Sequence, residues 1–369
     1  MMSYFVKIVR ASKEMQDFLD LPFRIYKNDH KWVPPLRSEV ERTLDQKRNP
    51  YFSGSDLQKF VCYKGNEPVA RTITVINPEH WKKFNQKTAF FGFYESLEDE
   101  LASAILFEKM EEYCKNQGAE YLEGPFNPNH YSELGMLVKN YEMPAFFEPY
   151  NPLYYPSYIK NEGFKVVYSI HTRINNDAGE KLNLRHKNFN HHLETNGYTI
   201  RHFNLFDIKS ELGRIREVFN DAFSENWHFL PVSMKEYLFS AKSLFAVTNP
   251  SLIQIVEHYG KPVGVLQCVL NINPLLQSLK GRFSITDIYK LLVQRKAIRE
   301  VIIYAVGIKK AYQNSRAFIL LTNAMLKIAQ RYPVVYCTWM SDDNVAAVKA
   351  SEIIGLKPYK WFEVYGKSL

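Results

Sequence analysis

A chain of 369 residues with 46% hydrophobic content is longer than one hydrophobic core usually fills, which predicts two domains. Its 47 basic and 39 acidic residues leave a net charge of +8, but the charge is diffuse and no nucleic-acid motif appears, so nucleic acid is not expected as a partner. The start, MMSYFVKIVRASKE, has no apolar leader, and no window approaches the ~18 apolar residues of a spanning helix. We therefore expect a cytoplasmic protein, at most peripheral to the inner membrane.

The cysteines give no sign of a metal site or a disulfide framework. They form no Cys-x-x-Cys pair and no histidine-rich pattern, and they are Cys62, Cys114, Cys268 and Cys337. Such spacing is typical of reduced, structural cysteines. No bound metal is expected.

Two segments share one pattern. FVCYKGNEPVARTITVIN, from Phe60, and IVEHYGKPVGVLQCVLN, from Ile255, each predict a strand, a glycine-containing turn and a strand. Each is followed by a further strand, TAFFGFYE or VIIYAVGI, and by a long helix at about 98–116 or 315–330. The repetition predicts two copies of one fold, with a boundary in the polar stretch 175–198 and domains at 1–180 and 198–369.

The stretch YCTWMSDDNVAAVKASEIIGLKPYK predicts a strand, a capped helix and a second strand. Residues 334–340 are aromatic and β-branched, as in a buried strand. Ser341, Asp342 and Asp343 are candidates for the helix N-cap, and Gly355 is expected to end the helix.

These elements, in this order, resemble the Gcn5-related N-acetyltransferase fold. VGIKKAYQNSRAFILLTNAMLKIAQ resembles the acyl-CoA strand, loop and helix of that superfamily, and DDNVAAVKASEIIGL resembles its Asn-x-x-Ala…Gly-[Phe/Leu] segment. The whole chain resembles a tandem family of bacterial acyltransferase-like proteins through LPFRIYKNDHKWVPPLRSEVERTLD, GPFNPNHYSELGMLV, YNPLYYPSYIKNEGF and FNDAFSENWHFLP. The resemblance implies an α/β fold (α+β, mixed sheets) of two tandem acetyltransferase-like domains.

The resemblance also implies where a thioester cofactor, acetyl-CoA or a longer acyl-CoA, would bind. Two strands of the C-terminal domain would part and leave backbone groups for the pantetheine arm. The residues implied as cofactor-binding are Val306, Gly307, Ile308, Gln313, Asn314, Ser315, Arg316, Ala317 and Asn344. This chain departs from the family where the phosphate loop usually has glycines, and where a catalytic tyrosine is replaced by Ser351.

Charge assigns the cofactor to one half. Lys309, Lys310 and Arg316 surround the expected C-terminal helix start, where cations are unfavourable unless an anion joins them. The matching N-terminal helix begins SLEDELASA, in which Ser96 and Asp99 predict a capping box and the acids would repel pyrophosphate. The N-terminal domain is thus expected to lack the cofactor and to bind the acceptor or be structural. The alternative is that the basic residues only face water.

Acid and base candidates come from the N-terminal half. The stretch YEMPAFFEPYNPLYYPSYI, residues 141–159, has too many prolines for a regular helix and predicts a loop with an aromatic wall. Its Tyr150, Tyr154 and Tyr155 are candidates to line an acceptor pocket and donate a proton, unless the loop only packs over the core. Glu133 is the preferred base for an amine, unless it is simply solvated.

A basic segment, LKGRFSITDIYKLLVQRKAIR at 279–299, predicts an amphipathic helix. Such a helix suits an anionic membrane surface or an acyl-carrier protein, although a solvated basic face explains it as well.

Together the patterns predict an N-acyltransferase that moves an acyl group from acyl-CoA, or from an acyl-carrier protein, to an amine. The superfamily includes lipid N-acyltransferases similar to bacterial ceramide synthases, so a long-chain lipid amine is favoured over a small-molecule acceptor. Two alternatives stay open: a non-catalytic acyl-CoA or carrier-protein binding protein, and a Fem-like aminoacyl transferase.

Overall fold

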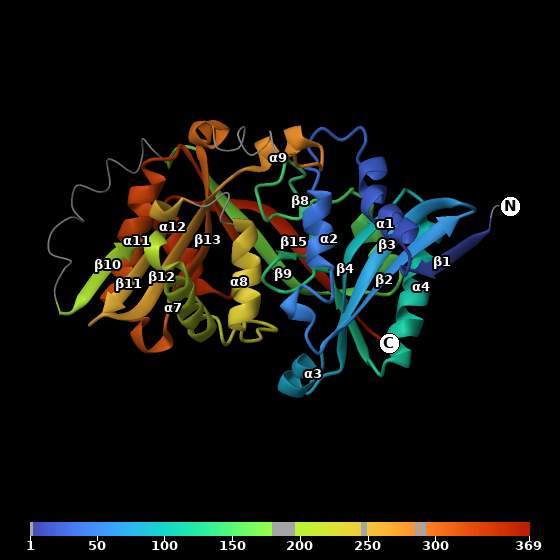
Figure 1. The fold of residues 1–369 in the computed structure, drawn as a ribbon, viewed down its shortest axis with the longest axis horizontal. Helices are drawn as coiled ribbons and strands as arrows, with labels where there is room; N and C mark the ends of the chain where they lie inside the picture. Colours follow the sequence, from blue (N-terminus) through green and yellow to red (C-terminus); the bar gives the residue numbers. More distant parts are fainter. Residues whose placement is uncertain (1–2, 179–195, 245–248, 285–286, 288–292) are drawn as a thin grey trace. The chain divides into compact units, whose positions relative to one another are not determined.

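The computed structural model describes residues 3–178, 196–244, 249–284, 287 and 293–369 (Figure 1). The described chain divides into two compact units that are not contiguous halves. Unit 1 comprises Met1–Ile170, Leu276–Ser284 and Lys360–Leu369, and unit 2 comprises His171–Leu275 and Ile285–Tyr359. The boundary expected at 175–198 falls mostly on residues outside the described part.

Unit 1 contains a mixed sheet in the order β1-β2-β3-β4-β5, followed by the unit 1 part of β15, which also pairs with β8. Its pairs are antiparallel except β4 with β5. Its strands are β1 (Tyr4–Ile8), β2 (Asp56–Lys64), β3 (Glu67–Ile76), β4 (Thr88–Ser96), β5 (Tyr121–Gly124), β8 (Met136–Lys139) and β15 (Lys357–Ser368). Its helices include α1 (Ser12–Ile25), α2 (Arg37–Thr43), α3 (Pro78–Phe84), α4 (Glu100–Asn116) and α5 (Tyr155–Asn161). A separate two-stranded sheet joins β6 (Phe126–Asn127) to β7 (Glu133–Leu134).

Unit 2 repeats this order as β10-β11-β12-β13-β14, followed by the end of β9, which pairs antiparallel with β14. Here β13 and β14 are the parallel pair. Its strands are β9 (Lys165–Asn175, beginning in unit 1), β10 (Tyr198–His202), β11 (Ile253–His258), β12 (Lys261–Leu270), β13 (Glu300–Ile308) and β14 (Val334–Met340). Its helices include α7 (Ile208–Ala222), α8 (Met234–Leu244), α9 (Asn273–Leu279, ending in unit 1), α11 (Arg316–Ala329) and α12 (Val345–Ile353).

The prediction of two equivalent hairpins is confirmed. The β2–β3 hairpin and the β11–β12 hairpin occupy the second and third positions of their sheets. Each is followed by a strand, a long helix and a parallel strand, as the repeated pattern predicts.

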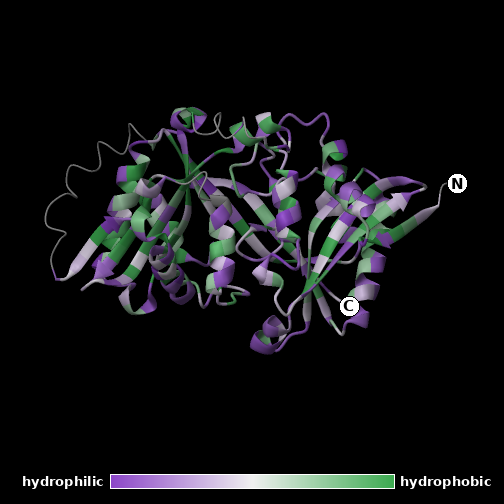
Figure 2. Cartoon of the chain, in the orientation of Figure 1, coloured by the Kyte–Doolittle hydropathy of each residue, from purple (hydrophilic) through white to green (hydrophobic). Residues whose placement is uncertain are grey.

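Helices α7 and α11 cover opposite faces of the unit 2 sheet. Val265 packs in one cluster with Leu212 and Val218 of α7, whereas a Cβ on the neighbouring Gly264 would lie 3.2 Å from Leu321 of α11. Adjacent strand residues point to opposite faces, so the two helices sandwich β12. Figure 2 shows the consequence as hydrophobic colour along β12 and β13.

Three local predictions are wrong in detail. Asn344, and not Ser341, Asp342 or Asp343, is the N-cap of α12, because its side chain accepts the Ala347 N–H at 3.1 Å. The capping box expected from Ser96 is absent from the described α4 start, where Asp99 is the N-cap and accepts the Ala102 N–H.

The third error concerns residues 141–159, which are not loop throughout. α5 begins at Tyr155 with Pro156 in its first turn, where proline costs no helical hydrogen bond. The aromatic segment therefore ends in a helix that fixes the position of Tyr155.

The expected amphipathic helix at 279–299 lies largely outside the described residues. Of that segment, the structure describes a turn after α9 and a short helix, η4 (Arg295–Ala297). Among the described helices, none is long and apolar enough to cross a bilayer.

Candidate functional site

The parallel strands of unit 2 separate part-way along their length. β13 pairs with β14 from Glu300 to Ile303, and from there to Ile308 β12 is the only described strand that pairs with β13. At the separation, the Thr338 hydroxyl donates to the carbonyl oxygen of Tyr304 at 2.9 Å. We call residues 304–308 the open edge of β13. An extended ligand arm can pair with such an edge as an added strand would.

The open edge carries three residues expected to contact a thioester. Val306, Gly307 and Ile308 are consecutive on β13, and Gly307 is buried where a Cβ would lie 3.1 Å from Ala222 of α7. A register shift between Gln267 and Cys268 of β12 places a bulge at the start of this segment. Bulges commonly redirect backbone groups beside functional sites.

The open edge leads into the start of α11. Ser315 is the N-cap: its hydroxyl accepts the Ala317 N–H at 3.2 Å and donates to the Tyr312 carbonyl oxygen. Gln313 and Asn314 are exposed, and Arg316 is half-buried in the first turn. The structure thus brings the expected loop residues together at a helix N-terminus that follows the open edge, a geometry that favours an anion.

Two cations expected to hold that anion already have carboxylate partners. Lys309 pairs with Glu217, and Lys310 pairs with Glu225, both acids of the α7 region. The Lys310 N–H also donates to Asp221 at 2.7 Å. Of the three predicted cations, Lys309, Lys310 and Arg316, only Arg316 is part of α11, in its first turn. Asn344 is exposed at the α12 start, and its side chain is used in capping.

The matching edge in unit 1 is filled by the chain itself. β4 pairs with β5 only up to Phe90, and beyond it the Phe93 N–H donates to Asn127 Oδ1 at 2.6 Å. A Cβ at Gly92 would lie 1.7 Å from the Phe126 carbonyl oxygen, so the β6 backbone touches β4 directly. Little room is left on β4 for a ligand strand.

The end of β4 is closed by two tyrosines. The Ser96 N–H donates to the Tyr155 hydroxyl at 2.7 Å, and the Tyr154 hydroxyl donates to the Ser96 carbonyl oxygen at 2.8 Å. The α4 start beyond is occupied by Asp99, which accepts hydrogen bonds from Tyr4 and Lys64. Unit 1 thus bonds with side chains the backbone groups at the end of β4, the strand that corresponds to β13 in unit 2.

A half-buried carboxylate that was not expected from the sequence lies beside this closure. Glu95 of β4 accepts hydrogen bonds from Tyr155 at 2.8 Å and Tyr26 at 2.9 Å, and it lies 3.8 Å from Arg71. Burial raises the pKa of Glu95 to about 6, although Arg71 opposes the shift. The sequence does contain a signal for this contact, namely a glutamate inside the aromatic run TAFFGFYES. Acids in such a strand are rarely buried without a partner, so a partner for Glu95 could have been expected.

The predicted proton donors are both hydrogen-bonded within unit 1. Tyr155 is buried, and burial together with Glu95 raises its pKa well above the ordinary value. Tyr150 is half-buried and donates to Asp29 at 2.7 Å, and burial raises its pKa too. The structure therefore groups Tyr155 with Glu95. The Tyr150 hydroxyl bonds to Asp29 instead, although the Tyr150 carbonyl oxygen lies 3.4 Å from the hydroxyl of Tyr26, the other partner of Glu95.

Glu133, the predicted base, lies on β7 opposite Asn127, whose side-chain amide donates to its carboxylate at 3.2 Å. The side chain is exposed, so the loss of hydration that raises its pKa is partial, and the bond from Asn127 opposes it. Its negative charge also raises the pKa of Glu95. An accessible carboxylate with a raised pKa has the properties of a general base.

The described histidine, cysteine and acidic residues are the candidates for a metal site. Within the described ranges, no group of histidine, cysteine or acidic residues is arranged to hold a metal ion. The four cysteines are free, and burial raises the pKa of Cys62, Cys114 and Cys337 to about 12.

Comparison with solved structures decides the fold. The chain matches a tandem N-acetyltransferase from the clavulanic acid biosynthesis pathway with a TM-score of 0.56, at 10% identity, over 99% of this chain and 98% of the other. It matches an N-acetyltransferase from Sphaerobacter thermophilus with a TM-score of 0.52, at 11% identity, over 99% and 95% of the chains. The protein has the tandem Gcn5-related N-acetyltransferase fold.

Two curated proteins are similar to this tandem acetyltransferase-fold chain along its length. A protein named bacterial ceramide synthase, from Caulobacter vibrioides, is 26% identical over 376 residues, 98% of this chain and 96% of the relative. Protein YghO of Escherichia coli is 26% identical over 389 residues, covering 100% and 97%. No family model matches the chain.

Proposed function

We propose that this protein is an N-acyltransferase that moves an acyl group from acyl-CoA to an amine. The observation that carries the proposal is the contrast between the open edge of β13 in unit 2 and the corresponding edge of β4 in unit 1. Unit 2 presents an open edge that runs into a helix N-terminus, and unit 1 fills the same place with its own residues. Acyl-CoA fits the open arrangement, because its pantetheine arm pairs as a strand does and its pyrophosphate suits the α11 start.

When bound, acyl-CoA supplies a thioester carbonyl that an amine can attack. The attack forms a C–N bond and breaks the C–S bond, so a thiolate leaves and the amine must lose a proton. Glu133 accepts that proton in this proposal, and backbone N–H groups of the open edge stabilise the charge on the carbonyl oxygen. Arg316 and the first turn of α11 hold the phosphates.

The proton donor and the acceptor are also proposals. Tyr150 and Tyr155 are candidates to protonate the departing thiolate. Because both hydroxyls already donate to carboxylates, water is an alternative donor. The acceptor is proposed to be a long-chain amine because a full-length relative is named a ceramide synthase and because the acceptor half is rich in aromatic residues.

A non-catalytic acyl-CoA binding protein is the second candidate. It is favoured by Ser351, which stands where the family has its acid and whose hydroxyl donates to the Val348 carbonyl oxygen at 2.6 Å. A buried hydroxyl used in this way is a poor proton donor.

Turnover separates these two functions. Purified protein is incubated with acetyl-CoA or palmitoyl-CoA and a long-chain amine, and released thiol and amide product are measured. We expect amide formation, with Glu133→Gln lowering turnover by ~10²-fold and leaving the CoA affinity unchanged. Glu79→Gln removes an exposed acid of the same unit as a control. CoA binding without thiol release from any tested amine would favour the binding protein.

A further inference from the structure

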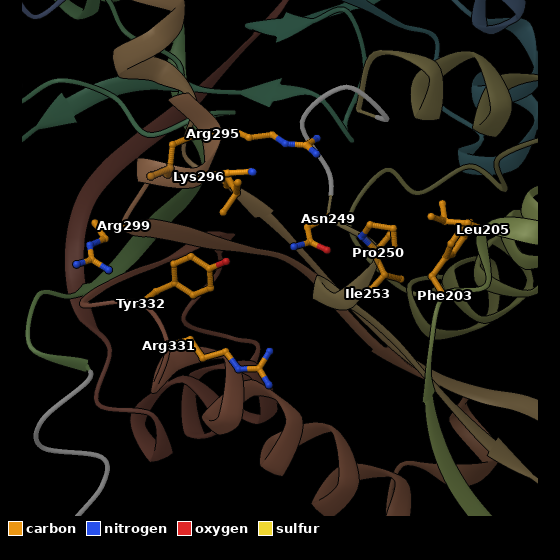
Figure 3. A pocket seen from close by; sticks show the side chains of 12 residues that line it. Phe203, Leu205, Asn249, Pro250, Ile253, Arg295, Lys296, Arg299, Arg331 and Tyr332 are labelled. Carbon is orange, nitrogen blue, oxygen red and sulfur yellow. The ribbon is translucent and has the colours of Figure 1, made fainter. Parts of the chain in front are cut away.

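A pocket with a basic lining lies in unit 2, apart from the open edge of β13. Its volume is about 650 Å³, and it is bordered by the first residues of β11, the last of β12 and the segment before β13 (Figure 3). Four basic side chains line it: Arg295, Lys296, Arg299 and Arg331. We call this the cationic pocket.

Within the described part of unit 2, these four cations form no ion pair of the kind that other basic residues form. Lys309, for example, is held by Glu217. Among the described residues, no carboxylate forms an ion pair with the four, and none of the residues lining the pocket is acidic. Like charges that converge on one cavity repel, and an anion bound there removes the repulsion.

The rest of the lining is apolar. Phe203 and Leu270 are buried in the wall, and Leu205, at its edge, is 52% exposed. The neighbouring Phe206 is fully exposed. Exposed aromatic and aliphatic side chains beside basic groups are the chemistry of surfaces that enter the head-group region of a bilayer.

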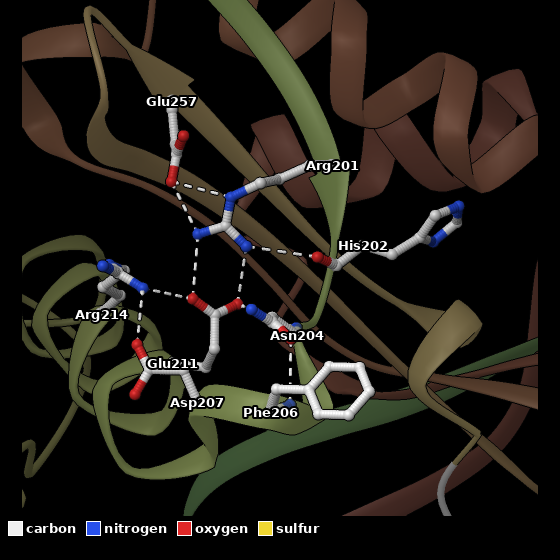
Figure 4. Close-up of polar contacts among 8 residues, drawn as sticks. All are labelled: Arg201, His202, Asn204, Phe206, Asp207, Glu211, Arg214 and Glu257. Atoms are coloured by element: carbon white, nitrogen blue, oxygen red, sulfur yellow. Dashed lines mark hydrogen bonds and ion pairs between the residues drawn. The ribbon is translucent and has the colours of Figure 1, made fainter.

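The turn that carries Leu205 and Phe206 is held rigidly (Figure 4). Arg201 of β10 bonds both oxygens of the buried Glu211 of α7, at 2.6 and 2.9 Å, and also bonds Glu257. Burial alone would raise the pKa of Glu211, but the bonds from Arg201 and its neighbours lower it below the ordinary value.

The same network reaches the turn itself. The Asn204 N–H donates to Glu211 at 3.2 Å, and the Asn204 side chain accepts the Phe206 N–H at 2.9 Å. The exposure of Leu205 and Phe206 is therefore built into the fold and does not come from a loose loop.

We propose that the cationic pocket binds the phosphate head group of an anionic membrane phospholipid. Leu205 and Phe206 would then lie in the apolar part of the bilayer surface. Arginine binds phosphate oxygens through two parallel N–H donors, and the pocket has the volume of a typical ligand site. The pocket meets β13 at its beginning, and the open edge follows Ile303, about 15 Å further along at the rise of a strand. The site is thus separate from the proposed thioester site.

The test uses the full chain in two assays. The first is co-sedimentation with vesicles of phosphatidylcholine, alone or with about 30 mol % phosphatidylglycerol. The second is titration with dihexanoyl phosphatidic acid, a dispersed short-chain lipid, with inorganic phosphate for comparison. We expect binding to anionic vesicles only, and binding of the dispersed lipid at least ~10-fold tighter than that of phosphate.

Charge reversal provides matched variants. Arg299→Glu/Arg331→Glu is expected to weaken both interactions at least ~10-fold, whereas Lys209→Glu/Lys235→Glu changes net charge equally on exposed helix positions and should retain the dispersed-lipid affinity. Arg299→Gln/Arg331→Gln gives the same test if the reversed variant folds poorly. Phe206→Ser should weaken vesicle binding and leave phosphate binding unchanged.

Three results would overturn the proposal. Equal losses in the pocket pair and the control pair would mean diffuse attraction to a protein of charge +8. Vesicle binding without affinity for the dispersed lipid would mean a surface and no pocket. Equal affinity for phosphate and the lipid would remove the role of the apolar wall. CoA affinity, measured in parallel, should be the same in all variants.

Discussion

The hydroxyl of Tyr155 donates to the half-buried carboxylate of Glu95 at 2.8 Å and accepts the N–H of Ser96 at 2.7 Å. One phenol thereby closes the end of β4 and fixes an acid whose pKa burial raises from the ordinary value of 4.5 to about 6. The same contact blocks in unit 1 the kind of edge that unit 2 leaves open.

The raised pKa of Glu95 predicts a pH dependence of stability. Because the folded state binds this proton more tightly than the unfolded state, the contribution is favourable below pH 4.5 and is lost as pH rises through about 6. The loss is about 2 kcal/mol for a shift of this size. Urea unfolding of wild type and Glu95→Gln from pH 4.5 to 7.5 measures it. The difference between the two curves should change across this window, and a constant difference would refute the assignment.

Gly92 predicts how tightly β6 closes the β4 edge. A Cβ there would lie 1.7 Å from the Phe126 carbonyl oxygen, so Gly92→Ala should destabilise the protein by more than about 2 kcal/mol. A Cβ added at Gly213 of α7 would have nothing within 4 Å, so Gly213→Ala should stabilise by up to about 1 kcal/mol. Thermal unfolding of both variants checks the pair, and a neutral Gly92→Ala would contradict the closed edge.

Lys360 predicts a non-additive pair in unit 1. Its ammonium is fully buried, 3.1 Å from Glu148, and donates to the carbonyl oxygens of Glu142 and Met143. Lys360→Met should cost about 3–5 kcal/mol because the buried Glu148 loses its counter-ion and keeps only the N–H of Ala145 among its described partners. Adding Glu148→Leu should recover part of the loss. A double-mutant cycle by urea unfolding gives the coupling, and simple additivity would contradict it.

Arg316 predicts the strength of CoA binding. Replacing Arg316 by Glu puts a negative charge in the first turn of α11 and should weaken CoA by about 1–3 kcal/mol. Glu98→Lys, before α4, should have almost no effect, because that helix start is occupied by Asp99. Calorimetric titration at moderate salt measures both variants. Equal effects would show that the two halves do not have the roles proposed here.

The sequence was informative where local pattern determines structure. The two hairpins, the strand β14 and the helix closed by Gly355 follow from alternation and turn residues, and Gly355 has a positive φ of 75°. The sequence predicts a buried strand at 334–340, whereas most of β14 is half-buried. The position of the cap was not predicted because four capping residues, Ser341 to Asn344, stand in a row, and the structure shows that Asn344 makes the cap bond. The prolines of 141–159 predict a loop, but Pro156 is compatible with the first turn of α5.

The site was less predictable because its key contacts are between residues far apart in the chain. Tyr26 and Tyr155 each lie 60 or more positions from Glu95, and no spacing rule announces such a cluster. The sequence predicts that Lys309 and Lys310 are available for a phosphate, but Glu217 of α7 and Glu225 just after it are their partners in the structure. Residues 360–369 belong to unit 1 because β15 pairs with β5, and local sequence pattern does not predict this pairing.

Amide hydrogen exchange with and without CoA tests the assignment of the thioester to the open edge of β13 most directly. We expect CoA to slow exchange in peptides covering residues 304–317, the open edge and the α11 start, and to leave residues 91–102 of β4 and α4 unchanged. Protection of residues 91–102 without protection of 304–317 would contradict the assignment.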